Sequence, residues 1–212
     1  MSWLEVLVEG ASDVPTLKEV LHRKFGLQEG QDFRLHAHQG KGKLPLNPLS
    51  KPDPKHRGLL DQLPAKLGGY GKSLAHDGWV LVVLDADDAP CAQLLSDLNA
   101  MLASLPVKPQ VMFRLAIEET ESWFIADAAA LEKAYPGQVK KAVLKNIKPD
   151  AIVGAWERLA ESLKINPKEV SGAMKVEWAK NIAPHLDFDA PCSPSLAKLI
   201  QGLEKLMKAR SL

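Results

Sequence analysis

The sequence predicts an α/β fold, in which a mostly parallel β-sheet is flanked by helices and followed by a helical C-terminal extension. Short apolar runs rich in branched residues alternate with segments whose apolar residues recur every three or four positions. The runs stop at turn or charged residues, as buried parallel strands do. Only helical patterns follow residue 127, so we expect a sheet domain at 1–127 and a helical extension at 128–212. The pattern leaves open whether the extension is a separate lobe or wraps the sheet.

The first half of the predicted sheet reads as strand, helix, strand. A strand is expected at residues 4–8, where the run LEVLV stops before a Glu-Gly pair. Ser12 offers an N-cap to the next helix, and Gly26 ends that helix. Alternating apolar and polar residues predict a second strand at 33–37. A loop rich in proline and lysine and a helix at 55–67 should follow.

The second half repeats this alternation before the helices take over. The most apolar segment predicts a strand at 80–84, a clean apolar stripe predicts a helix at 91–105, and a fourth strand is expected at 111–117. In the extension, Asp150 and Ser193 each precede an apolar stripe with helical spacing. Both residues are therefore expected to start helices.

The composition is that of a globular protein and excludes a disordered chain. Of the 212 residues, 46% are hydrophobic and 25% are charged. The net charge of +1 creates no overall field toward nucleic acid or anionic membranes, so any basic surface must be local. Cys91 and Cys192 lie far apart without a CxxC motif, which argues against a disulfide framework and a zinc site. With no apolar stretch near the ~20 residues that span a bilayer, we expect a cytoplasmic protein.

Three carboxylates follow the third predicted strand within four positions. The segment WVLVVLDADDAP places Asp85, Asp87 and Asp88 there, and Glu9 follows the first strand. The carboxyl ends of parallel strands meet at one sheet edge, and Asp85 and Asp87 point the same way while the strand continues. Like charges this close repel one another unless a cation lies between them, and Mg²⁺ prefers oxygen ligands. The sequence therefore predicts a divalent-metal site.

Some of these residues also have a plainer interpretation. At least one of Asp87 and Asp88 is expected to cap the helix that begins at Pro90. Asp13 either complements the positive end of its own helix or reaches the metal. Trp123 is expected to be a core anchor, because its neighbours are also apolar.

The segments LVEGASD and VVLDADD together resemble the Toprim fold. That fold is shared by topoisomerases, primases, small ribonucleases and the overcoming-lysogenization-defect nucleases. The longer segments LLDQLPAKLGGYGKS, VVLDADDAPCAQLLSDL and RLAIEETESWFIAD resemble a bacterial Toprim-like family of unknown function with an ExExW…D signature after the fourth strand. In this chain the signature falls on Glu119, Glu121, Trp123 and Asp127. The match to full topoisomerases or primases is poor, because zinc-binding cysteines are missing.

The resemblance implies a role for each matched residue. In Toprim domains the first-strand glutamate acts in acid/base catalysis, so Glu9 is expected to be catalytic. The metal ligands implied or suggested by position are Asp85, Asp87, Asp13, Glu119 and Glu121. A site that hydrolyses phosphodiesters also needs nearby cations to hold the polyanion. From the loop after the second strand we expect Lys41, Lys43 and Arg57 to do so.

These expectations describe a Mg²⁺-dependent nuclease, with Mn²⁺ as an alternative metal, that hydrolyses phosphodiester bonds in DNA or RNA. Nucleases with such domains often act with an ATPase in bacterial phage defence. The resemblance therefore implies an ATPase protein partner, since this chain has no phosphate-binding loop of its own.

Two alternatives stay open at this point. The chain could be a non-catalytic Toprim-like subunit whose metal site organises contacts with a partner protein. It could also be a haloacid-dehalogenase-type phosphatase, because DADDA nearly satisfies the DxDx[TV] pattern in which the first Asp is a nucleophile. The phosphatase fits less well, since Ala89 occupies the last motif position and Glu9 is left without a role.

Overall fold

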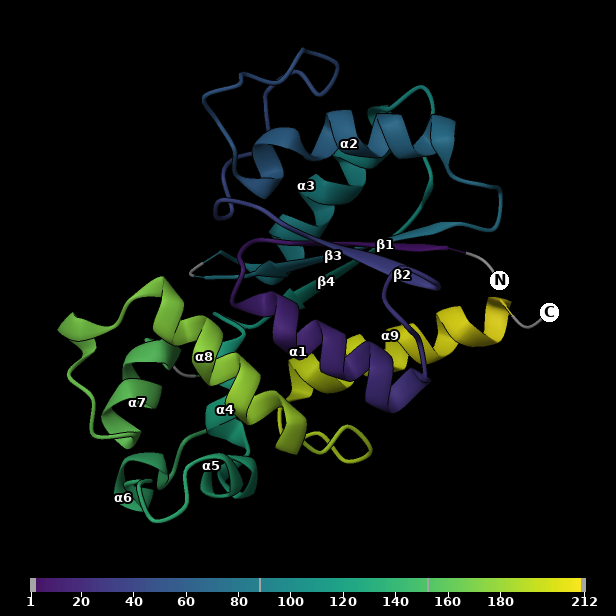
Figure 1. Cartoon of the computed structure of the whole chain (residues 1–212). Coiled ribbons are helices and arrows are strands. Elements are labelled where there is room, and N and C mark those ends of the chain that lie inside the picture. The colour runs from purple at the N-terminus through teal and green to yellow at the C-terminus, as the bar shows by residue number, and fades with distance from the viewer. Residues whose placement is uncertain (1–2, 88, 152, 211–212) are drawn as a thin grey trace.

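The computed structural model describes residues 3–87, 89–151 and 153–210, and this part of the chain contains a four-stranded parallel sheet (Figure 1). The strand order is β2-β1-β3-β4, so β1 lies between the second and third strands. The bounds are β1 (Leu4–Val8), β2 (Phe33–Ala37), β3 (Trp79–Asp85) and β4 (Gln110–Ala116). Parallel neighbours require crossover connections. The predicted α/β fold with a helical C-terminal part is confirmed.

Helices cover both faces of the sheet. Figure 1 shows α2 and α3 on one face and α1 and α9 on the other, with α4 to α8 gathered beside α1. The bounds are α1 (Asp13–Glu19), α2 (Leu59–Ser73), α3 (Cys91–Ser104), α4 (Glu121–Ala126), α5 (Ala128–Ala134), α6 (Lys141–Leu144), α7 (Ala155–Ser162), α8 (Gly172–Ile182) and α9 (Pro194–Arg210). A π-helical segment, Val20–Lys24, continues α1, and 3₁₀ turns span Pro167–Glu169 and Ala183–His185.

The strand residues divide between two hydrophobic cores, because successive side chains of a strand point to opposite faces. In β3, Val80, Val82 and Leu84 belong to the core under α2 and α3. Leu81 and Val83 belong to the core on the face of α1 and α9. The side chains on both faces of β3 are therefore buried in a hydrophobic core up to Leu84.

The helices after residue 127 pack into the same core as one face of the sheet. That core joins Val6 and Val8 of β1 to Leu159 of α7, Trp178 of α8 and Leu203 of α9. All five side chains are at most 3% exposed, and burial of apolar surface contributes about 25 cal/mol per Å². Hydrophobic burial therefore ties the C-terminal helices to the sheet. None of the described helices is both long and apolar enough to cross a membrane.

Helix α2 begins and ends later than the predicted 55–67. Its start is fixed by Asp61, whose carboxylate accepts hydrogen bonds from the backbone N–H groups of Gly58 and Lys43, both at 3.1 Å. These bonds keep the preceding residues in the loop. The helix continues past Pro64 and three glycines because its leucines are buried, and tertiary packing overrides local propensity.

Asp150 does not start a helix as predicted, since α7 begins at Ala155. Asp150 instead has a left-handed φ of 61°. Its carboxylate accepts hydrogen bonds from the hydroxyls of Ser193 (2.8 Å) and Ser195 (3.1 Å) and from the backbone N–H of Ser195 (2.5 Å). Ser193 is confirmed as a helix start, because its hydroxyl accepts a hydrogen bond from Leu196 N at 3.3 Å. Asp150 therefore anchors α9.

Two glycines of α2 should respond in opposite directions to substitution by alanine. A Cβ at Gly71 would lie 2.7 Å from the backbone N of Lys108, so the backbone must shift. Gly71→Ala should therefore lower the free energy of unfolding by about 1–3 kcal/mol. At Gly68 a Cβ meets nothing within 4 Å, so Gly68→Ala should raise it by up to about 1 kcal/mol. Urea unfolding measures both, and a destabilised Gly68→Ala variant would contradict the packing described for α2.

Candidate carboxylate site

Asp85 ends β3 on the face of the sheet that carries α1, α4 and α8. It follows Leu81 and Val83 at two-residue intervals, so its side chain shares their face. The pKa of its carboxyl group is raised well above the ordinary value, first by burial and then by four other carboxylates. Among the described residues, no hydrogen bond or ion pair reaches the Asp85 carboxylate. We call Asp85 and its four neighbours the carboxylate cluster: Glu9, Asp13, Asp85, Glu119 and Glu121.

Glu9 follows β1 and is joined directly to the end of β3. Its Oε1 accepts a hydrogen bond from the backbone N–H of Asp85 at 2.8 Å, across the neighbouring strands β1 and β3. The residue is 9% exposed. Burial raises the pKa of Glu9 to about 7, although the bond from Asp85 and the charge of Lys41 lower it. Glu9 is therefore a carboxyl group that gains and loses a proton near neutral pH.

Asp13 begins α1 and links that helix to α4. Its Oδ2 accepts a hydrogen bond from Gly10 N at 2.9 Å, and its Oδ1 accepts one from the Thr120 hydroxyl at 2.9 Å. Asp13 is 4% exposed, and burial raises its pKa to about 6. The side chain thus holds the turn after β1 against the residue that precedes α4. The expected place of Asp13 at a helix start is confirmed, and its role as a metal ligand stays a prediction.

Glu119 and Glu121 meet a lysine from the C-terminal helices. Lys175 Nζ of α8 lies 3.6 Å from Glu119 Oε1 and 3.4 Å from Glu121 Oε1. Glu119 Oε2 also accepts a hydrogen bond from Trp156 N at 3.4 Å. Burial, followed by the charge of Glu121, raises the pKa of Glu119 to about 7. Sequence analysis missed Lys175, because a single lysine on an amphipathic helix carries no motif.

Glu118 lies outside the cluster and serves the backbone instead. Its carboxylate accepts hydrogen bonds from the N–H groups of Gly154 and Ala155, the latter at 3.0 Å, at the start of α7. Negative charge is stabilising at a helix N-terminus. Glu118 also has a left-handed φ of 62°. The conformation of Glu118 and its hydrogen bonds therefore fix the position of the neighbouring Glu119 relative to the start of α7.

Asp87 does not point the same way as Asp85, because β3 ends at Asp85 and Asp87 has a left-handed φ of 46°. Its side chain is 55% exposed and pairs with Lys41 Nζ at 2.8 Å. The helix α3 has Pro90 at its N-cap position and receives no side-chain cap from a described residue, so Asp87 does not cap it and the prediction that one of the two aspartates does so depends on Asp88. The alternative capping residue, Asp88, lies outside the described residues.

Lys41 is committed to the turn that follows β3. Besides Asp87, its ammonium group donates to the carbonyl oxygens of Asp85 (2.6 Å) and Ala86 (3.2 Å). A lysine has three N–H donors, and these contacts use all three. In this arrangement Lys41 positions the backbone of the candidate site and has no donor left for a substrate.

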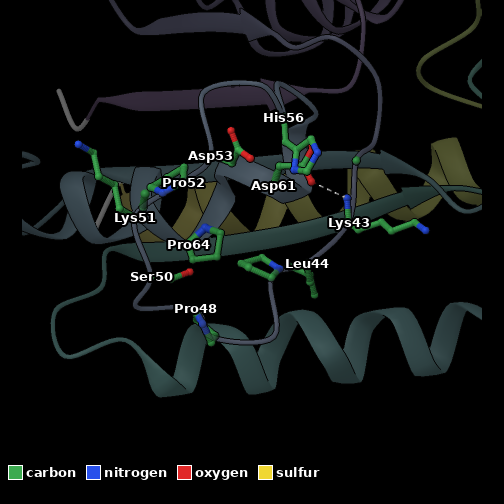
Figure 2. Close-up of a pocket in the computed structure, with 13 residues that line it drawn as sticks. Lys43, Leu44, Pro48, Ser50, Lys51, Pro52, Asp53, His56, Asp61 and Pro64 are labelled. Atoms are coloured by element: carbon green, nitrogen blue, oxygen red, sulfur yellow. Dashed lines mark hydrogen bonds between the residues drawn. The ribbon is translucent and has the colours of Figure 1, made fainter.

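Lys43 and Arg57 lie on the exposed loop between β2 and α2. The loop and α2 enclose an open cavity of about 630 Å³, and Figure 2 shows the Lys43 side chain extending away from the other labelled residues. Arg57 Nε donates to Pro54 O at 3.4 Å. Within the described chain, no hydrogen bond or ion pair joins Lys43 or Arg57 to the carboxylate cluster. Both residues are exposed, so the expected contact with a substrate remains a prediction.

The donors of the cluster have the chemistry of a Mg²⁺ site, since all are carboxylate oxygens. The spacing of these carboxylates, however, is not that of a metal site. Among the described residues, no group of three or more His, Cys, Asp or Glu is arranged to hold a metal ion. Two lysine ammonium groups already pair with expected ligands, Lys41 with Asp87 and Lys175 with Glu119 and Glu121. Metal binding would require at least some of these carboxylates to move.

A comparison with protein families identifies the chain. The family described as "Domain of unknown function (DUF4276)" matches residues 8–204. The chain belongs to this family. The matched range runs from the last residue of β1 into α9, so the DUF4276 domain contains every member of the cluster and also Lys175. No curated protein and no solved structure matches the chain.

The remaining residues of the ExExW…D signature are structural in this DUF4276 chain. Trp123 is 1% exposed, as predicted for a core anchor, and its Nε1 donates to the Ser195 hydroxyl at 2.8 Å. Asp127 caps α5 by accepting a hydrogen bond from Ala130 N at 2.9 Å. The signature therefore combines two cluster carboxylates with two residues that fix α4 between α5 and α9.

The free energy of unfolding should depend on pH through the cluster. The pKa of Glu9 is 4.5 ordinarily and about 7 in the folded chain, so the folded state binds more protons between these values. The stabilisation from protonated Glu9 is complete below pH 4.5 and is lost as the pH rises through 7. With a chelator present to remove metal ions, the free energy of unfolding of the native chain should fall between pH 4.5 and 7. Glu9→Gln should make this fall smaller by at most about 3 kcal/mol.

Urea unfolding across this pH window measures the effect. The control is Glu169→Gln, which changes a glutamate in an exposed turn far from the cluster in sequence. The control should keep the pH dependence of the native chain. Identical slopes for Glu9→Gln and the native chain would mean that the pKa of Glu9 is not raised.

Proposed function

We propose that this DUF4276 chain is a Mg²⁺-dependent hydrolase that cleaves phosphodiester bonds in nucleic acid. The observation that carries the proposal is the Asp85 carboxylate, which has no hydrogen-bond or ion-pair partner among the described residues and lies among four other carboxylates from the end of β1 and the starts of α1 and α4. Repulsion among like charges raises their pKa values and costs stability unless a cation neutralises them. A divalent cation with oxygen ligands would relieve this repulsion.

The metal would be held by Asp85 together with Asp13 on one side and Glu119 or Glu121 on the other. When bound it would polarise the phosphate and stabilise charge on the leaving oxygen. The resemblance of LVEGASD and VVLDADD to Toprim domains supports the same assignment, and it is the reason for preferring a phosphodiester to other substrates.

Glu9 would accept the proton of the attacking water. A general base works best when its pKa lies near the working pH, and the pKa of Glu9 is about 7. Its Oε1 is bonded to Asp85 N, which fixes the orientation of the carboxyl group and leaves Oε2 for the water. Glu9 therefore has the position and the proton affinity that the role demands.

The substrate would approach from the loop between β2 and α2. Lys43 and Arg57 are exposed there and carry the positive charge that a polyanion requires. Lys41, which uses its donors within the chain, would act by holding the turn at Asp85 and Asp87. A separate ATPase protein remains part of the proposal as a partner, on the strength of the Toprim resemblance.

A non-catalytic subunit is the second candidate, and one observation favours it. Lys41 and Lys175 already supply positive charge to Asp87, Glu119 and Glu121 without any metal. Carboxylates compensated in part by lysines could serve only to shape a surface for a partner protein. A phosphatase fits less well, because Ala89 occupies the last position of the DxDx[TV] pattern and Glu9 would have no role.

Mg²⁺ should raise the melting temperature of the native chain at constant ionic strength. Binding to the folded state alone stabilises it by RT ln(1 + [L]/Kd), which is about 1.4 kcal/mol at ten times Kd. For a chain of this size that corresponds to roughly 3–6 °C. Asp85→Asn should reduce the shift, and Glu169→Gln should keep it. A melting temperature that does not respond to millimolar Mg²⁺ would favour the non-catalytic subunit.

Cleavage should depend on Glu9 more strongly than metal binding does. Glu9→Gln should lower the rate of cleavage of DNA or RNA by about 10²–10⁴-fold, because the amide cannot accept the proton. Asp85→Asn should weaken both metal binding and cleavage. The assay uses the purified chain in Mg²⁺ or Mn²⁺, with and without a partner ATPase, and Glu169→Gln as control. Cleavage that survives Glu9→Gln would rule out the proposed mechanism.

A further inference from the structure

Lys175 occupies an unusual position for a lysine. Its Nζ lies between two carboxylate oxygens, 3.4 Å from Glu121 and 3.6 Å from Glu119, and 4.8 Å from the centroid of the Trp156 ring. The lysine side chain is 23% exposed, whereas that of Glu121 is only 4% exposed. The ammonium group is therefore more exposed to solvent than the Glu121 carboxylate that it pairs with.

The contacts of Lys175 are of a weaker kind than those of Lys41. Both N–O distances exceed the 2.7–3.2 Å that is typical of N–H···O bonds. Within the described residues Lys175 Nζ makes ion pairs and a cation–π contact but no hydrogen bond. Lys41, by contrast, donates to three oxygens. Charge attraction alone holds the Lys175 ammonium, on a flexible four-carbon stem that reaches solvent.

The cluster has the carboxylate oxygens that a divalent cation prefers, but they are not spaced as in a metal site. The position of Lys175 is part of the reason. It places a positive charge beside two of the expected ligands. We propose that the Lys175 ammonium is a resident counter-ion of the Glu119–Glu121 pair and competes with a divalent cation for it. A cation that enters would displace Lys175 from the pair, so Lys175 sets the affinity and selectivity of the cluster for metal. This inference rests on the proposed metal-dependent function.

Metal titration of charge variants tests the competition. Lys175→Met keeps most of the unbranched side chain and removes its charge, so the variant should bind Mg²⁺ and Mn²⁺ roughly tenfold more tightly or better. Lys175→Arg keeps the charge and should bind no more tightly than the native chain. The matched control is Lys180→Met, on the exposed side of the same helix. Isothermal titration calorimetry gives the affinities.

A second measurement follows the Trp156 side chain of the native protein. The indole ¹H–¹⁵N signal of Trp156, assigned with Trp156→Phe, reports the ammonium above its ring. Mg²⁺ should shift this signal in the native chain as Lys175 leaves the ring, and the shift should be largely lost in Lys175→Met. A signal that stays in place while Mg²⁺ binds would overturn the inference.

The outcomes separate this inference from the proposed function. Equal or weaker Mg²⁺ binding by Lys175→Met would overturn the competition, even if the native chain binds metal and cleaves nucleic acid. Tighter binding by Lys175→Met would support the competition, even if no cleavage is found and the nuclease proposal fails. Absence of metal binding by both proteins would overturn the competition and leave the cluster neutralised by lysines alone.

Discussion

The Asp85 carboxyl group repels four other carboxyl groups that the fold brings to the same edge of the sheet. Backbone hydrogen bonds hold this arrangement together. Glu9 is held by the N–H of Asp85, and Asp13 is held by the N–H of Gly10 and the hydroxyl of Thr120. Each bond stabilises the charged form of the carboxyl group it reaches, while burial disfavours that form. The carboxyl groups at this site repel one another, and the packing of the two hydrophobic cores keeps them close together.

The C-terminal helices complete this site as well as covering the sheet. Helix α7 offers its N-terminal N–H groups to Glu118 and Glu119, and α8 contributes Lys175. A helix N-terminus and an ammonium group are both positive, so they attract the glutamates that follow β4. The same helices bury Leu159 and Trp178 against the sheet side of the core. Hydrophobic packing and charge compensation therefore depend on the same elements.

A buried polar network fixes where the signature segment meets the last helix. Trp123 donates to Ser195, and Ser195 in turn contacts Asp150. Asp150 holds a left-handed φ of 61°, a conformation that persists for a non-glycine residue only when surrounding contacts enforce it. This network joins α4, the loop before α7 and the start of α9.

The sequence by itself determined the sheet and the meeting of Glu9 with Asp85. Strand alternation and the parallel order of apolar runs are local signals, and the ends of parallel strands coincide by geometry. The tertiary structure decided what the local pattern could not encode. The strand ends at Asp85, so the Asp87 side chain turns away and pairs with Lys41 from the loop after β2. Lys175 reaches Glu121 from a helix more than fifty residues further along the chain. Such pairings depend on how distant helices pack, and packing is set by the whole hydrophobic core, which no short segment specifies.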